Sequence, residues 1–107
     1  MMEGKRNRET GWQNIKIKEN SFIAKFAAKK LQSDNVAIVI GTTIHLHNAS
    51  RQDLLKNEKW LKHEMCHIKQ FQQYGFLPFI IKYLWESLKR GYYNNKFEVA
   101  ARAAEKL

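Results

Sequence analysis

The feature that most constrains the fold is the segment 50–74, because its apolar residues recur at helical spacing and neither proline nor glycine interrupts them. These apolar residues are Leu54, Leu55, Trp60, Leu61, Ile68 and Phe71. Ser50 is a suitable helix N-cap with Asp53 three residues later, and Gly75 is typical of the residue just past a helix end. The segment therefore predicts one long helix.

Residues 63–67 of this predicted helix read His63-Glu64-Met65-Cys66-His67. Positions four apart lie on one face of a helix, so both imidazoles can reach a single metal ion. Each residue advances by about 100 degrees, which places Glu64 to one side of the stripe that the two histidines share. Zinc lowers the pKa of a bound water, and a carboxylate placed there can take the proton and pass it to a leaving amine. The motif predicts a zinc hydrolase.

A catalytic zinc of this type needs a third protein ligand and one open position. We favour Glu98, because it opens a predicted helix, residues 97–105, whose alanines allow a close approach to another helix. In the simpler interpretation, alanine is only a good helix former and Glu98 is a favourable charge in the first turn. The other candidates left open are Glu86, Glu105, His45 and His47.

Simpler interpretations also exist for parts of the motif. Cys66 is offset from the stripe of the two histidines, and we expect it to be a small buried packing residue rather than part of a second metal or redox site. The motif as a whole could be accidental, with His63 and His67 on a solvated face and Glu64 in ordinary salt bridges.

Two tyrosines, Tyr92 and Tyr93, lie in the segment 91–95 that joins the last two predicted helices. A tyrosine donor can stabilise the oxyanion that forms when water adds to a carbonyl, and both residues directly precede the helix of Glu98. Tyr92 and Tyr93 are therefore both candidate catalytic residues. The simpler alternative is that they pack over the core.

The remaining pattern predicts an α+β fold, with a sheet of about three strands, antiparallel or mixed, packed by about four helices. The histidine motif lies on the second of these helices. Phe22 and Phe26 belong to the predicted apolar face of the first helix, and the apolar residues of the helix 76–90 are expected in the core. The expected strands are 15–18, 36–40 and 44–47, and the expected helices are 21–31, 50–74, 76–90 and 97–105.

With 107 residues, the chain is long enough for one hydrophobic core and too short for two. We expect a flexible basic arm at 1–10 and a single domain over 11–107. The chain has 19 lysines and arginines against 10 acidic residues, a net charge of +9. These basic residues are dispersed and accompany no recognisable nucleic-acid module, so nucleic acid is not the partner that we predict.

The sequence contains no apolar run of the roughly 20 residues that a membrane span requires, and its start lacks the pattern of a signal peptide. We therefore predict no membrane partner. A single cysteine is compatible with a reducing compartment, so the cytoplasm is the expected location.

His63, Glu64, His67 and a downstream Glu98 resemble the gluzincin group of zinc metallopeptidases. At this length the chain is most similar to the minimal, single-domain kind, the minigluzincins, over about residues 15–105. The resemblance implies a zincin-like domain, a Zn²⁺ cofactor and hydrolysis of peptide bonds. It also implies a peptide substrate added as a strand along the edge of the strand 42–47.

A chain this short lacks the residues with which larger gluzincins build the lower half of their cleft, so a partner or self-association could help to hold the substrate. Two alternative functions stay open. One is a catalytically weak or latent zinc-binding domain with a zincin fold. The other is a basic module that binds nucleic acid or protein, in which the motif is accidental.

Overall fold

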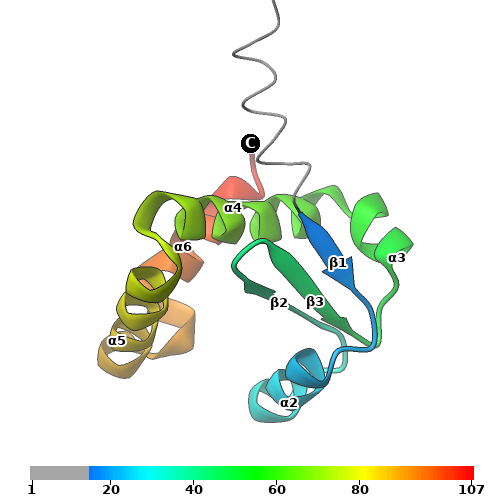
Figure 1. Ribbon diagram of the computed structural model, residues 1–107, viewed down its shortest axis with the longest axis horizontal. Helices are drawn as coiled ribbons and strands as arrows, with labels where there is room; N and C mark the ends of the chain where they lie inside the picture. The colour runs from blue at the N-terminus through cyan, green and yellow to red at the C-terminus, as the bar shows by residue number, and fades with distance from the viewer. Residues whose placement is uncertain (1–14) are drawn as a thin grey trace, which may run out of the picture.

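The computed structural model describes residues 15–107, in which five helices and a three-stranded mixed sheet form an α+β fold (Figure 1). The α+β class and the small sheet are as the sequence predicts, whereas the predicted arm 1–10 lies outside the described residues. The elements are β1 (Lys16–Lys18), α2 (Phe22–Leu31), β2 (Val36–Ile40), β3 (Thr43–His47), α3 (Arg51–Lys56), α4 (Glu58–Tyr74), α5 (Phe76–Asn94) and α6 (Lys96–Ala104).

The sheet has the order β1-β3-β2, with β3 parallel to β1 and antiparallel to β2. Residues 41–42 form the turn of the β2–β3 hairpin, and Gly41 has φ 65°, a left-handed conformation that glycine adopts without steric cost. Because β3 is paired on both sides, the expectation of a free edge along residues 42–47 is wrong. In the described part of the chain, β2 pairs with β3 alone and forms one edge of the sheet.

The predicted helix 50–74 is divided at Asn57, which has the extended angles φ −95° and ψ 95°. The Asn57 side chain accepts a hydrogen bond from the main-chain N–H of Trp60, so Asn57 ends α3 and caps α4. At the start of α3, Ser50 and Asp53 form the reciprocal bonds of a capping box. The histidine motif therefore lies on α4, the third helix of residues 15–107 and not the second.

The buried face of α2 differs from the predicted one. Ala24 and Ala28 pack on the sheet, whereas the side chains of Phe22 and Phe26 are 86% and 63% exposed. Small alanine side chains allow the helix to lie close to the narrow sheet, which turns the two phenylalanines to the outside. The predicted apolar face of this helix is therefore not the face that packs on the sheet.

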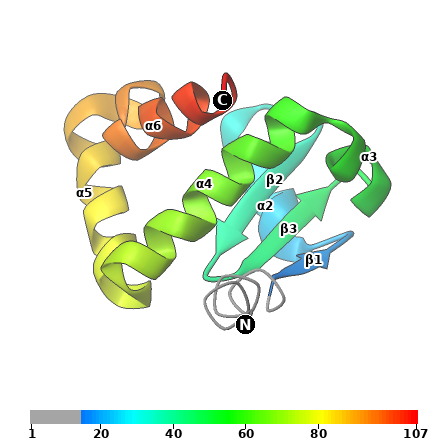
Figure 2. The same ribbon diagram turned by 90° about the horizontal axis from the view of Figure 1, so that it is seen from above.

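Helix α5 is also less buried than predicted. Phe79 faces α4 and α6 and is buried, while a row of large apolar side chains on the opposite face is exposed. This row consists of Leu77, Ile81, Leu84, Trp85 and Leu88. Figure 2 shows the reason, since α5 lies at one end of the molecule, where α4 and α6 are its main neighbours. Neighbouring elements can cover only one of its faces.

The main hydrophobic core lies between the sheet and α4 and continues to the contacts of α4 with α5 and α6. Its buried members are Val39, Ile44, Leu46, Leu54, Ile68, Phe71, Phe79 and Phe97. A smaller cluster of Ala24, Ala28 and Val36 joins α2 to the sheet. In residues 15–107, none of the helices has both the length and the apolar character needed to cross a bilayer.

Candidate metal centre

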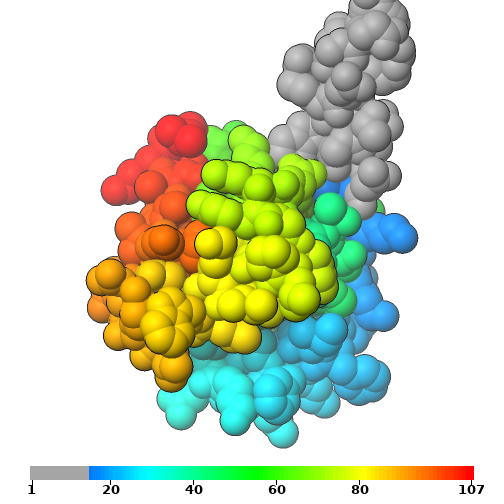
Figure 3. Space-filling view, turned by 60° about the vertical axis from the view of Figure 1, so that its left-hand side comes forward, coloured from blue at the N-terminus to red at the C-terminus, as the bar shows by residue number. Residues whose placement is uncertain are grey.

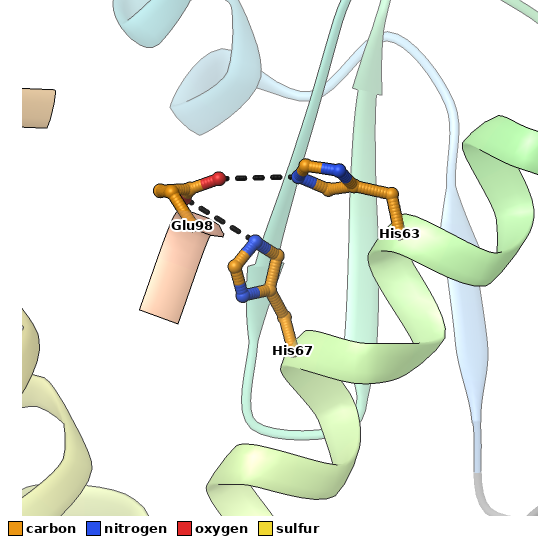
Figure 4. Close-up of side chains that lie close together, drawn as sticks. All are labelled: His63, His67 and Glu98. Carbon is orange, nitrogen blue, oxygen red and sulfur yellow. Dashed lines mark hydrogen bonds and ion pairs between the residues drawn. The ribbon is translucent and has the colours of Figure 1, made fainter. Parts of the chain in front are cut away.

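Side chains from α4 and α6 meet at one point (Figure 4). The Nε2 atom of His63 lies 3.1 Å from Oε1 of Glu98, and the Nε2 atom of His67 lies 3.2 Å from Oε2 of the same carboxylate. One ligand atom from each residue can be chosen so that all three lie within 4.8 Å of one another. The structure thus brings together the three residues that the sequence indicates as metal ligands.

The position of Glu98 depends on Asn95, which is fully buried at the start of α6. Its side-chain oxygen accepts a hydrogen bond from the N–H of Phe97, and its amide nitrogen donates to Ser87 Oγ and to the carbonyl oxygen of Tyr83. These bonds join the first turn of α6 to α5. Glu98 lies in that first turn, and its carboxylate is held toward α4.

Each imidazole also has a hydrogen-bond partner at its Nδ1 atom, on the side away from Glu98. The Nδ1 atom of His63 lies 2.7 Å from Oε2 of Glu105, and Nδ1 of His67 lies 2.9 Å from Oε1 of Gln70. The amide nitrogen of Gln70 donates to the carbonyl oxygen of Phe97, so its oxygen is free to accept from His67. With both Nδ1 atoms engaged, the Nε2 atoms point to the centre, as is usual for histidines that bind metal.

These donors fit zinc. Two imidazole nitrogens and one carboxylate oxygen are the protein ligands of many catalytic zinc sites, in which a fourth position stays open. The Nδ1 partners supply the outer hydrogen bonds that such ligands need. No other group of three or more histidine, cysteine or acidic residues in the described part of the chain is arranged to hold a metal ion.

The ionisable groups of the centre shift one another's pKa values. Burial alone would lower the pKa of His63, but its hydrogen bonds to Glu98 and Glu105 and the nearby charge of Glu64 outweigh burial and raise the pKa to about 9. For Glu98, burial works against ionisation, yet the hydrogen bonds from His63 and His67 hold the pKa well below its usual range. In the metal-free protein the centre is therefore an ion pair of histidine and carboxylate.

Glu64 lies beside this pair and is buried. Burial raises the pKa of its carboxyl to about 7, although the charges of His67 and His63 oppose the shift. A carboxyl group with a pKa near neutrality can both accept and return a proton. Glu64 also lines the same cavity as the three candidate ligands.

Tyr83 is a site residue that the sequence analysis missed. Its hydroxyl donates a hydrogen bond to Oε2 of Glu98, and its ring makes an edge contact with His67. Burial raises the pKa of Tyr83, and the charge of Glu98 raises it further, so the hydroxyl keeps its proton. Tyr83 lies four residues after Phe79 on the inner face of α5, a position that is typical of a core residue. Nothing in the sequence therefore indicated its contact with Glu98.

The two candidate catalytic tyrosines lie in different surroundings. Tyr92 lines the cavity with Glu64 and Glu98, and burial together with these two negative charges raises the pKa of its hydroxyl. The side chains of Tyr92 and Tyr93 are 46% and 68% exposed, and the guanidinium of Arg102 lies 4.0 Å from the centre of the Tyr93 ring. Tyr92 is therefore the tyrosine that can donate into the cavity, and Tyr93 belongs to the surface.

The alternative ligands have other partners. Glu86 accepts a hydrogen bond from the main-chain N–H of Lys96, and His45 Nδ1 lies 2.8 Å from Ser21 Oγ, beside α2. Glu105 contacts the Nδ1 side of His63, away from the centre. His47 and Cys66 are half-buried and are not members of the cluster. Burial raises the pKa of the Cys66 thiol, which agrees with a packing role.

A cavity of about 280 Å³ adjoins the centre between β2 and α5. Residues 37–40 of β2 form one wall, and the other walls are mainly apolar. The apolar wall residues are Phe71, Phe79, Ile80 and Leu84. The polar residues of the centre are thus gathered at one side of an otherwise hydrophobic space.

Comparisons of this chain with protein-family models, with curated proteins and with solved structures found no match.

Proposed function

We propose that this protein is a zinc-dependent peptidase of the gluzincin type, in which His63, His67 and Glu98 hold the metal. The supporting observation is that the Glu98 carboxylate reaches both Nε2 atoms, although it comes from a different helix. Two histidines four residues apart are common on helices, but a third ligand of the right chemistry at that point is not expected by accident.

A zinc ion bound there would supply Lewis acidity, which polarises a substrate carbonyl and makes a water molecule easier to deprotonate. Glu64 then acts as general base, because it is buried beside the ligands and the pKa of its carboxyl is raised to about 7. The same carboxyl returns the proton to the leaving amine. Tyr92 donates its hydroxyl proton in a hydrogen bond to the carbonyl oxygen as negative charge develops there.

The substrate is an extended peptide bound along β2, rather than along β3 as the sequence analysis expected. In a hairpin with a two-residue turn, the residues that flank the turn form a hydrogen-bonded pair, and such pairs alternate along the strands. Counting from Ile40, this alternation directs the main-chain groups of Ala37 and Val39 away from β3. Both residues line the cavity, so a peptide paired there lies beside Glu64.

The test combines zinc analysis with a peptidase assay. The purified protein should contain one zinc per chain, and it should cleave members of a mixed library of fluorogenic peptides. Glu64→Gln removes the base but leaves all three ligands, so we expect zinc to be retained and the cleavage rate to fall by about a hundredfold or more. Glu58→Gln, an exposed change in the same helix, is the matched control and should leave both unchanged.

The outcomes separate the competing functions. Absence of bound zinc would contradict the proposal and favour a basic interaction module with an accidental motif. Zinc without cleavage by the wild type would favour a latent zinc-binding domain. Cleavage at the wild-type rate by Glu64→Gln would contradict the role assigned to Glu64.

A further inference from the structure

Two helices expose apolar side chains that the metal centre does not use. On α2 the outward residues are Phe22 and Phe26, because Ala24 and Ala28 occupy the face toward the sheet. On α5 the outward residues form a continuous row of Leu77, Ile81, Leu84, Trp85 and Leu88, all exposed. We refer to these seven residues as the outer apolar surface. Exposed apolar residues that are grouped in this way on a small domain are typical of a binding site.

Lysines border the outer apolar surface on α2. At about 100 degrees per residue, Lys25 and Lys29 lie on one side of the phenylalanine pair and Lys30 lies on the other. The Lys30 ammonium is 5.4 Å from the centre of the Phe26 ring. The α2 face therefore has two aromatic rings with two lysines on one side and one lysine on the other.

Lysines also border the apolar row of α5, but on one side of it only. Lys82 and Lys89 follow one side of the apolar row, next to Trp85, and the Lys89 ammonium is 6.0 Å from the centre of the Trp85 ring. Leu84 belongs both to the row and to the lining of the cavity. The outer apolar surface thus reaches the mouth of the candidate active site.

The two helices lie on the same side of the molecule. In Figure 1 both α2 and α5 are at the lower edge, below α4 and away from the C-terminus. Figure 3 shows the yellow surface of α5 with the cyan surface of α2 below it. A partner on that side of the molecule therefore lies next to both helices.

Charge indicates the chemistry of that partner. A second copy of this chain would bring lysines against lysines, in a protein whose net charge is already +9. An anionic phospholipid surface complements the lysines and accepts the phenylalanine, tryptophan and leucine side chains between them. Leucine, phenylalanine and tryptophan flanked by lysine are the composition of helices that lie in a membrane interface.

We propose that the outer apolar surface docks on an anionic phospholipid membrane, with α2 and α5 lying in the interface and the mouth of the cavity next to the lipid. The prediction of no membrane partner rests on the absence of a spanning segment in the sequence, whereas peripheral binding needs none. This proposal stands independently of the peptidase activity, since it uses neither the zinc ligands nor Glu64.

The experiment is sedimentation of the full-length protein with vesicles of phosphatidylcholine, with and without about one third phosphatidylserine. We expect binding to the anionic vesicles alone, and we expect it to weaken as salt rises. The double variants Phe22→Ser with Phe26→Ser, and Ile81→Ser with Leu88→Ser, should each weaken binding about tenfold or more. Leu55→Ser, at an exposed leucine of α3, is the control and should bind like the wild type.

Circular dichroism of each variant verifies that the helices are intact, and two separate pairs keep the test valid if one pair unfolds. Equal binding by the wild type and both folded double variants would overturn the proposal in favour of non-specific attraction by the lysines. Failure of the wild type to bind anionic vesicles would also overturn it. In that case, sedimentation velocity could show a dimer of the wild type that is absent in the double variants. That result would assign the surface to a second copy of the chain.

Discussion

At the scale of single residues, the centre is a set of paired contacts in which each ligand has an outer partner. Glu105 supports His63, Gln70 supports His67, and Tyr83 supports Glu98. Such partners fix the orientation of the ligands and the nitrogen that faces the metal. Each one can be removed without touching a ligand, so their contributions can be measured separately.

Removing the Glu105 carboxylate should weaken zinc binding. We expect Glu105→Ala to raise the Kd for zinc about tenfold, because His63 loses the acceptor that orients its Nε2 atom, and Glu105→Gln to have a smaller effect. Competition with a chromophoric chelator measures the Kd, and Glu58→Ala, at an exposed position, is the matched control. An unchanged Kd in Glu105→Ala would show that this contact does not support the ligand.

The metal-free protein should lose stability as the pH rises above neutrality. The pKa of His63 is about 9 in the folded state and near 6.5 when unfolded, so the folded state holds this proton more tightly. The stabilisation from His63 is therefore complete below pH 6.5 and is lost as the pH rises through 9. Urea unfolding in the presence of a chelator, at pH 6 to 9.5, measures this decline.

His63→Gln is the control for this pH dependence, since it removes one of the two imidazoles whose pKa is raised beside Glu98, and the decline above pH 7 should become smaller. Zinc binding requires neutral histidines, so the extra stability given by zinc should instead increase with pH. A metal-free wild type whose free energy of unfolding rises between pH 7 and 9 would contradict the proposed ion pair.

At the scale of helices, Asn95 links α5 to α6 and so determines where Glu98 lies. Asn95→Ala should lower the free energy of unfolding by about 1–3 kcal/mol, because it removes the cap of α6 and leaves buried polar groups without partners. It should also weaken zinc binding, since the first turn of α6 carries Glu98. Urea unfolding and the chelator assay measure the two effects.

The control for this prediction is Asn57→Ala, which removes the cap of α4 at a break far along the chain from Glu98. We expect that change to reduce stability with little effect on the Kd for zinc. Equal losses of zinc affinity in the two variants would mean that the effect reflects general destabilisation and not the position of Glu98.

The sequence predicted those parts of this arrangement that depend on local spacing. Two histidines four apart face the same way on any helix, and Glu98 opens a helix rich in alanine, so these residues could be chosen before the structure was known. The break at Asn57 was missed because it contains neither proline nor glycine. Its signal was an asparagine before a glutamate, which is typical of a helix start.

The buried faces of α2 and α5 could not be predicted, since both helices carry apolar residues on two sides. Which side is buried depends on the neighbours, and a sheet of three short strands covers little of either helix. Tyr83 and Gln70 were missed for a related reason. Their roles depend on hydrogen bonds between α4, α5 and α6, which no spacing within a single helix reveals.

At the scale of the whole molecule, the metal centre joins α4 to α6, and zinc should therefore stabilise the entire domain. For a ligand that binds only the folded state, free zinc at 100 times its Kd adds about 2.7 kcal/mol to the free energy of unfolding. We expect a chelator to lower Tm and added zinc to restore it. His63→Ala should abolish this response, whereas a response of the same size in that variant would indicate that zinc binds elsewhere.

The most direct test of the central claim is a crystal structure of the zinc-loaded protein, with the metal located by its anomalous scattering. We predict one zinc ion within about 2.0–2.2 Å of His63 Nε2, His67 Nε2 and a carboxylate oxygen of Glu98, with one position open toward the cavity. A zinc ion bound without Glu98, or bound at another place on the chain, would contradict the proposed centre and the function based on it.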